Sequence, residues 1–205
     1  MIAALLVAWN IAQLWRDTNS HASTSHGVKA FAQRKYADAV KDFASANSIS
    51  PSPRRAFNLG TAQIAAGNRE QGSSTLGKAM RTPELRADAL FNRGNSALAS
   101  SAYDYAIRDY ADVLRLRPKD PSAKRNLEIA LARRSQQQQQ RSGGSRYPQK
   151  GSSPHPQKQN TDAAPNDQQK KDADVEALLR SVQQQEQEEL TRMHRARGEK
   201  VHVGW

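Results

Sequence analysis

Hydrophobic residues are distributed along this chain in four different ways, and each predicts a different kind of segment. Residues 1–15 are almost entirely apolar, and residues 23–135 carry apolar, small and polar residues in an order that repeats. Residues 136–171 contain no Leu, Ile, Val, Met or Phe, whereas from residue 172 apolar residues return at three- and four-residue steps. The pattern predicts an N-terminal apolar segment, a central folded domain, a linker and a C-terminal amphipathic helix.

The repeat in the central segment has a fixed length. The sequence FNLGTAQIAAGN begins at Phe57, and FNRGNSALASSA begins 34 residues later at Phe91. Asn58, Asn92 and Asn126 are separated by the same interval. A period of about 20–50 residues is typical of stacked repeat proteins, in which each unit buries its apolar face against the next. We therefore expect an all-α array of about three helical hairpins over residues 23–135.

The spacing of small, aromatic and proline residues within each unit resembles that of the tetratricopeptide repeat (TPR). In the first copy the matching residues are Gly27, Tyr36, Ala39, Phe43, Ala46 and Pro51. In the third copy they are Gly94, Tyr103, Ala106, Tyr110 and Pro118. The middle copy is degenerate, because Gly72 stands where Ala is expected and the terminal proline has moved to Pro83. The resemblance implies a solenoid of helix–turn–helix units.

Glycine residues inside the expected helices support the same architecture on physical grounds. Gly27, Gly60 and Gly94 lie in otherwise helical windows, where Gly is about 1 kcal/mol less favourable than Ala. A small residue at this position lets the second helix of the hairpin approach closely. We expect Phe43 and Tyr110 to fill the space one turn further along.

The array is expected to end in a capping helix followed by a linker. Residues 120–135 repeat the first helix of a unit without a second helix, with Asp120 and Ser122 as candidate N-caps. Gln, Ser, Gly, Pro and Lys dominate residues 136–171. Such a composition cannot offset the entropy lost on ordering the chain, so we expect residues 136–171 to be a disordered linker.

Residues 172–205 predict an amphipathic helix and a short tail. The apolar residues form one stripe, and an isolated helix with a single apolar stripe is marginal in water. We therefore expect this segment to bind a protein partner. The candidate contact residues are Val175, Leu178, Leu179, Val182, Leu190, Met193 and Trp205.

The N-terminal segment, residues 1–22, predicts contact with a membrane. Its apolar run stops at Arg16 and Asp17, which makes it shorter than the roughly 20 apolar residues of a spanning helix. Ser20 and Ala22 are small residues near a possible signal-peptidase site, although no positive residue precedes the apolar run. A cleaved signal, a short retained anchor, the tail of a longer membrane segment cut by a misplaced start codon, and a buried helix all fit this sequence.

The charge of the chain widens the choice of partner. The formal net charge is +11, from 31 Lys and Arg against 20 Asp and Glu, and the excess lies within residues 23–171. Nucleic acid, an anionic membrane or an acidic protein would each be attracted. However, Tyr147 is the only aromatic residue in the linker available for base stacking, and the repeats interleave acids with the basic residues. A nucleic-acid-associated protein is therefore the alternative hypothesis.

No set of residues in the sequence predicts catalysis. Cysteine is absent, and the five histidines lack the spacing of a zinc site: His21, His26, His155, His194 and His202. The chain also lacks a phosphate-binding glycine loop, a nucleophile elbow and a kinase motif. We expect no enzyme activity, no cofactor, no metal and no small-molecule substrate.

The expected binding surface is the concave face of the array, to which the first helix of each unit contributes most. Amide and guanidinium groups there can bind a peptide backbone or a carboxylate. The candidate groove residues are Arg54, Asn58, Asn92, Asn95, Arg125 and Asn126. This set is similar to the carboxylate clamp of some TPR domains, whose lysines have no counterparts here. The alternative is that Asn58 and Asn92 satisfy polar groups within the array.

The order of the segments carries a narrower resemblance. The capping sequence RNLEIAL, the Gln-rich tract and the ending VEALLRSVQQQEQEELTRMHRARGEKVHVGW resemble the TPR proteins of bacterial Bat aerotolerance operons. That family more usually has an acidic residue before the final Trp, where this chain has Gly204. The resemblance implies a scaffold subunit in an inner-membrane complex, facing the periplasm, with von Willebrand factor A (VWA) domain proteins as partners. It implies no chemistry by the chain itself.

Overall fold

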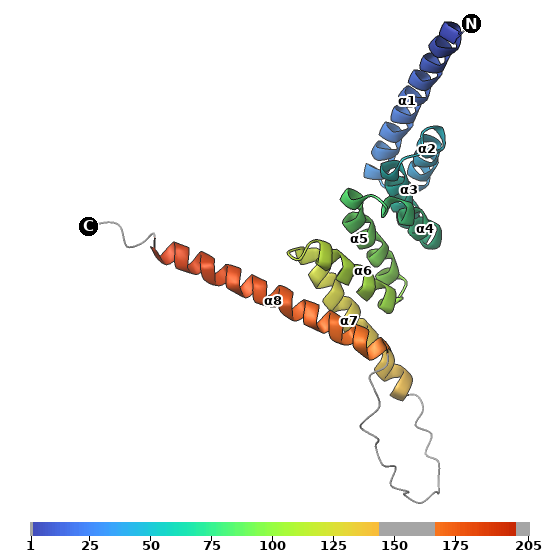
Figure 1. The fold of residues 1–205 in the computed structure, drawn as a ribbon. Coiled ribbons are helices and arrows are strands. Elements are labelled where there is room, and N and C mark those ends of the chain that lie inside the picture. Colours follow the sequence, from blue (N-terminus) through green and yellow to red (C-terminus); the bar gives the residue numbers. More distant parts are fainter. Residues whose placement is uncertain (1, 144–166, 200–205) are drawn as a thin grey trace, which may run out of the picture.

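The computed structural model describes residues 2–143 and 167–199, with side chains for residues 13–141 and 167–194. Within these ranges the chain forms eight helices and no strand (Figure 1). They are α1 (Ile2–Ala32), α2 (Tyr36–Ile49), α3 (Pro53–Ala65), α4 (Arg69–Ala79), α5 (Pro83–Ala99), α6 (Tyr103–Leu116), α7 (Pro121–Gly143) and α8 (Asp167–Glu199). Helices α1 to α6 pair as three successive hairpins, and α7 packs on α6. The expected all-α array of three hairpins and a capping helix is confirmed.

Each hairpin turns at a residue with a positive φ. Arg34 (60°), Gly67 (91°) and Ser101 (57°) occupy equivalent positions between the two helices of their hairpins. In the first turn Lys35 N donates to Ala30 O at 2.9 Å, and the other two turns contain the same bond. This six-to-one hydrogen bond is the Schellman arrangement that ends a helix in the left-handed conformation.

Proline residues open the later units. Pro53, Pro83 and Pro121 each stand at the start of a first helix, where the missing backbone N–H has no intrahelical partner to lose. Asp120 caps α7, because its Oδ1 accepts hydrogen bonds at 3.0 Å from two backbone N–H groups of the first turn. Of the two candidate N-caps, Asp120 is thus confirmed, and Ser122 lies inside the helix.

Glycine permits the close crossing of the first and third hairpins. A Cβ atom added to Gly27 would lie 2.7 Å from the ring of Phe43, and one added to Gly94 would lie 2.9 Å from the ring of Tyr110. Both rings are buried. The expectation that these rings fill the space beside the glycines is confirmed.

The middle hairpin crosses with two glycines. A Cβ atom on Gly60 would lie 2.9 Å from the carbonyl oxygen of Gly72, and one on Gly72 would lie 2.7 Å from the carbonyl oxygen of Gly60. Leu76, fully buried, takes the place of the aromatic ring. The substitution of Gly72 for alanine therefore brings the two backbones into contact, and the degenerate copy is a complete hairpin.

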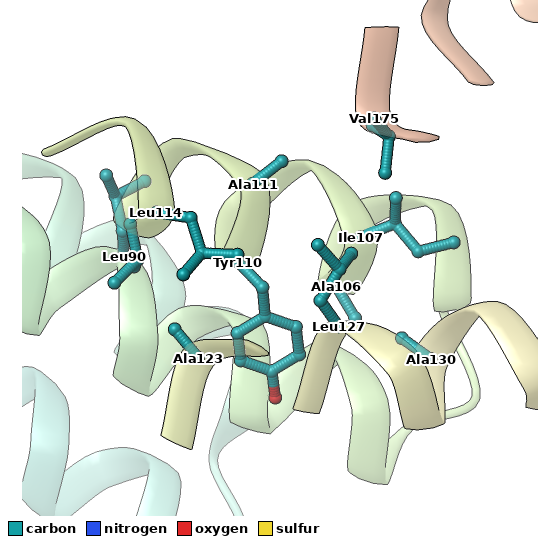
Figure 2. Close-up of a cluster of buried hydrophobic side chains, with 11 residues drawn as sticks. Leu90, Ala106, Ile107, Tyr110, Ala111, Leu114, Ala123, Leu127, Ala130 and Val175 are labelled. Atoms are coloured by element: carbon teal, nitrogen blue, oxygen red, sulfur yellow. The ribbon is translucent and has the colours of Figure 1, made fainter. Parts of the chain in front are cut away.

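The largest core cluster lies at the C-terminal end of the array and joins α5, α6, α7 and α8 (Figure 2). Its buried members are Leu90, Ala106, Ile107, Tyr110, Ala111, Val113, Leu114, Ala123, Leu127, Ala130 and Val175. Figure 2 shows Val175 pointing from α8 towards Ile107 of α6. The C-terminal helix thus docks on the array of its own chain.

Two boundaries of the expected linker differ from those observed. Helix α7 continues to Gly143 and α8 begins at Asp167, so residues 136–143 and 167–171 are helical. Gln, Arg and Lys are good helix formers, and a helix already nucleated by the core adds such residues one at a time. Residues 144–166, which make up the rest of the expected linker, lie outside the described part of the chain.

The N-terminal segment also lacks a boundary at residue 22. Helix α1 runs without a break from Ile2 to Ala32, because neither proline nor glycine occurs before Gly27. Ser20 is fully buried, and its Oγ donates to the carbonyl oxygen of Ala46 in α2 at 3.1 Å. Among the residues that the structure describes, no helix is long and apolar enough to cross a membrane.

Candidate protein-binding surfaces

Asparagine side chains link neighbouring first helices of the array. Asn92 Nδ2 on α5 donates to Thr61 Oγ1 on α3 at 3.1 Å. Asn126 Nδ2 on α7 donates to Asn95 Oδ1 on α5 at 2.9 Å. Both bonds connect the same two positions in successive units, so they fix the spacing between adjacent first helices. For Asn92, the alternative that its amide satisfies a neighbouring side chain is what the structure shows.

Asn95 also connects the two helices of its own hairpin. Its Oδ1 accepts a second hydrogen bond from the Tyr110 hydroxyl at 2.8 Å. Burial of this phenol, together with the nearby Asp109 carboxylate, raises the pKa of Tyr110 to about 12. Of the six candidate groove residues, Asn92, Asn95 and Asn126 therefore hold helices together.

The other three candidates keep their side chains available. Arg54 and Arg125 are exposed and Asn58 is half-buried, and within the described residues none of the three makes a side-chain hydrogen bond or ion pair. Asn58 lacks the hydrogen bond that Asn92 and Asn126 make to the preceding unit. The acceptor position, held by Thr61 and Asn95 in the later units, is held by Val28 in the first unit. Val28 has no polar side-chain atom and is 53% exposed. The N-terminal part of this face therefore offers an unpaired amide beside an exposed apolar residue.

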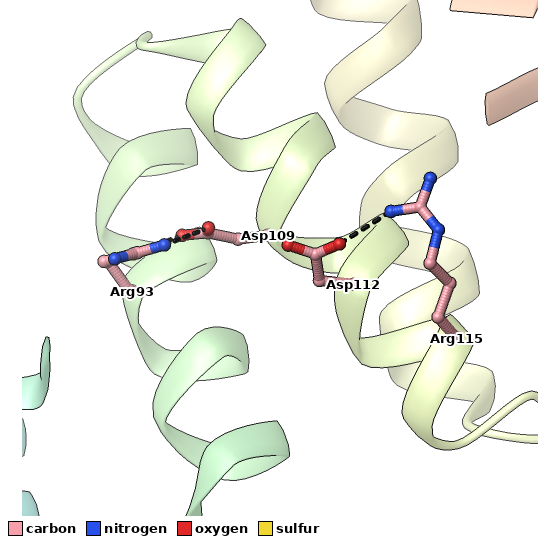
Figure 3. Close-up of polar contacts among 4 residues, drawn as sticks. All are labelled: Arg93, Asp109, Asp112 and Arg115. Carbon is pink, nitrogen blue, oxygen red and sulfur yellow. Dashed lines mark hydrogen bonds and ion pairs between the residues drawn. The ribbon is translucent and has the colours of Figure 1, made fainter. Parts of the chain in front are cut away.

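A partly buried ion pair that the sequence analysis missed lies beside the third crossing (Figure 3). Arg93 binds Asp109 through two hydrogen bonds, Nε to Oδ2 at 2.8 Å and Nη2 to Oδ1 at 2.6 Å. Asp109 is 2% exposed, and its hydrogen bonds raise the pKa of Arg93. The two residues directly precede Gly94 and Tyr110, which contact each other. Because Gly94 and Tyr110 are expected from the sequence to pack together, the opposite charges of the residues just before them could have indicated this ion pair.

The apolar stripe of α8 is divided between the array and solvent. Val175 and Val182 are buried, and Leu178 and Leu179 pack half-buried on the core cluster. The later residues Leu190 and Met193 are 44% and 58% exposed. Trp205, the last candidate contact residue, lies outside the described residues. Binding of this stripe to a partner stays a prediction, since its first half already contacts the chain's own array.

Ion pairs reinforce the docking of α8. Arg134 of α7 binds Asp172 at 2.8 Å, Lys119 binds Glu189 at 2.5 Å, and Lys124 binds Glu186. The basic residues all belong to the capping region and the acidic residues all belong to α8. The contact thus combines a short aliphatic interface with charge complementarity, and exposed pairs of this kind weaken as salt is added.

Comparison with known proteins identifies the fold. No family model and no curated protein matches the sequence. Among solved structures, the Arabidopsis OM64 TPR domain is similar, with a TM-score of 0.52 and 20% identity over 56% of this chain and 96% of that domain. The first TPR domain of human RPAP3 has a TM-score of 0.54 and 21% identity over 58% of this chain and 95% of that domain. The first TPR of Spaghetti (RPAP3), bound to the HSP90 peptide SRMEEVD, has a TM-score of 0.52 and 22% identity over 56% of this chain and 92% of that one. The central array of this chain therefore has the tetratricopeptide repeat fold.

Proposed function

We propose that this chain is a non-catalytic TPR adaptor that binds an extended segment of a protein partner on its first-helix face. The observation that carries the proposal is that only half of the candidate groove residues on that face are used to hold the helices together. Three asparagines are used to hold the helices, while Arg54, Asn58 and Arg125 are left without partners in the described structure. One similar TPR domain was solved with a bound peptide that contains acidic residues.

The chemistry of the unpaired groups suits a peptide. A guanidinium group can bind a carboxylate through two parallel hydrogen bonds, and a side-chain amide can pair with both the N–H and the C=O of an extended backbone. The hydrogen bonds between Asn126 and Asn95 and between Asn92 and Thr61 hold the helices in place before binding. A surface that is already ordered loses less entropy when the partner binds.

The order of segments supports a more specific setting, which is part of the same proposal. The apolar N-terminus, the array and the Leu-, Glu- and Arg-containing C-terminal helix resemble the Bat-operon TPR proteins. On this basis the chain serves as a scaffold in a bacterial inner-membrane complex, faces the periplasm, and has VWA-domain partners. Leu14 and Trp15, exposed on α1, add to the apolar surface available near the N-terminus.

Affinity capture from detergent-solubilised membranes tests this function. The full chain should co-purify with a VWA-domain protein, and the groove variant Arg54→Gln/Asn58→Ala/Arg125→Gln should lose it. The matched control Arg81→Gln/Arg133→Gln removes the same charge from exposed residues whose side chains form no hydrogen bond or ion pair in the described structure, and it should retain the partner. Retention by the groove variant would contradict the assigned surface. Fractionation that finds the chain only in cytosol would contradict the envelope setting.

The net positive charge supports nucleic acid as the second candidate partner. Some of the basic side chains are not free to bind phosphate, because they form ion pairs with acids: Arg93, Arg115, Arg117, Lys119, Lys124 and Arg134. Non-specific binding to DNA depends on unpaired cations and weakens steeply with salt. DNA binding by the full chain that persists at moderate salt would favour this candidate over the adaptor.

A further inference from the structure

A cleft of about 670 Å³ lies between the second and third hairpins. Its side chains come from α4, α5 and α6, whereas the candidate groove residues belong to α3, α5 and α7. The residues that matter for its chemistry are Arg69, Ser73, Ser74, Ser96 and Arg108. The volume is within the range of roughly 300–1,000 Å³ that is usual for ligand sites.

The first two turns of α4 line the cleft with two long and two short side chains. Arg69 and Glu70 are the long ones, and Ser73 and Ser74 are the short ones. Gly72, next to them, is pressed against α3, and a Cβ atom added to Gly77 would meet no atom within 4 Å. The short side chains of Ser73 and Ser74 therefore leave open space between α4 and the facing residues of α5 and α6.

The residues that line the cleft carry a net charge of +1, from three arginines against two acidic residues. Arg93 and Asp109 bind each other and cancel. Arg69 and Arg108 form no ion pair within the described residues, while Glu70 is the remaining acidic residue of the lining. The Arg108 guanidinium lies over the Tyr105 ring, 5.4 Å from its centroid, which holds this cation at the cleft edge.

One hydroxyl group of the cleft is free to bind a ligand. Ser96 is 3% exposed and lines the cleft, yet its Oγ makes no hydrogen bond to any residue that the structure describes. This oxygen is not one of the fully buried side-chain atoms that lack a partner, so it is accessible from the cleft. A ligand oxygen in the cleft can therefore accept a hydrogen bond from it.

We propose that this cleft binds a carboxylate side chain from an acidic segment of a protein partner. Arg69 and Arg108 supply the charge, and the hydroxyls of Ser96 and Ser74 supply neutral donors. The single uncompensated positive charge matches the single negative charge of a carboxylate, whereas a phosphate monoester carries about −1.5 to −2 at neutral pH. The site is separate from the first-helix face, so the array can hold two acidic segments at once.

Fluorescence anisotropy with a labelled hexaglutamate peptide and the full chain tests the proposal. Hexaglutamate should bind, and hexaglutamine should not. The variant Arg69→Gln/Arg108→Gln should raise the Kd for hexaglutamate about tenfold or more, because two charge-assisted hydrogen bonds are lost. The matched variant Arg81→Gln/Arg133→Gln removes the same charge from exposed residues outside the cleft, and it should change the Kd by less than about twofold.

A second variant fills the cleft without removing charge. Ser74 is exposed on α4, so Ser74→Trp should leave the helical circular dichroism unchanged and weaken hexaglutamate binding at least as much as Arg69→Gln/Arg108→Gln does. The proposal is overturned if hexaglutamate does not bind, if both arginine pairs weaken binding equally, or if Ser74→Trp leaves binding unchanged. Tighter binding of a phosphoserine peptide than of hexaglutamate would overturn the choice of carboxylate. Loss or retention of the partner in the groove variant bears on the proposed function and leaves this result unaffected.

Discussion

The contact between the backbones of α3 and α4 gives a sharp test of the packing. In Gly60→Ala the new Cβ would lie 2.9 Å from the carbonyl oxygen of Gly72 and 3.0 Å from the backbone nitrogen of Leu76. Favourable contacts between non-bonded heavy atoms begin at about 3.5 Å, so the two helices would have to move apart. Because both obstructing atoms belong to the backbone, neither can rotate away.

The expected loss of stability follows from two opposing effects. Overpacking a core in this way costs about 1–3 kcal/mol, and an obstruction by backbone belongs at the upper end of that range. Alanine in a helix gains up to about 1 kcal/mol over glycine. The net result should be a destabilisation of about 2 kcal/mol, which lowers the Tm of a chain this size by about 4–8 °C.

Gly77→Ala is the matched control, because it makes the same substitution in α4 with no atom within 4 Å of the new Cβ. It should raise the free energy of unfolding by up to about 1 kcal/mol. Thermal and urea unfolding of the full chain, followed by circular dichroism at the helix band, measures both variants. If Gly60→Ala were neutral or stabilising like the control, the close crossing would not be a requirement of this fold, and the reasoning would be refuted.

Three further outcomes are expected. Ser101→Gly should raise stability by about 0.5–1 kcal/mol in urea unfolding, because Ser101 has a φ of 57° that favours glycine, and Gly67→Ala at the matching turn should lower it by a similar amount. Burial raises the pKa of Tyr110 to about 12, so the folded state keeps this proton after the unfolded chain has lost it near pH 10. The free energy of unfolding should therefore fall as pH rises from about 10 to 12, and it should fall less in Tyr110→Phe. Urea unfolding at each pH measures both. Val182→Asp, at a buried position of α8, should release that helix and remove its hydrogen-exchange protection while α1–α6 stay protected, whereas the exposed control Leu190→Asp should not; equal protection in both variants would contradict the docking.

The repeat units could be predicted because their signal is local and periodic. Gly27 and Phe43, or Gly94 and Tyr110, stand at a constant separation in the sequence, so one successful alignment predicts every crossing. The turns at Gly67 and Ser101 follow from the same register. Composition alone does not predict the extension of α7 to Gly143, because a Gln-rich tract is typical of disorder, yet Gln and Arg can continue a helix that the core has already started.

The interactions between units could not be read in the same way. The bond between Asn126 and Asn95 depends on how far apart successive first helices lie, and no residue spacing in one unit gives that distance. The surface on which α8 docks could not be predicted either. The apolar stripe of α8 predicts that the helix packs on another surface, but only the folded array shows that Val175 packs on Ile107. The cleft at Ser96 combines residues of three helices from two repeat units, which a search for functional motifs does not detect.

The unbroken course of α1 has a mechanical consequence. With 31 residues at about 1.5 Å each, it is a rod of about 45 Å, and Ser20 bonds it to α2 midway along its length. There is no hinge between its apolar beginning and the first hairpin. Any surface that binds the first turns of α1 therefore also determines the orientation of the three hairpins.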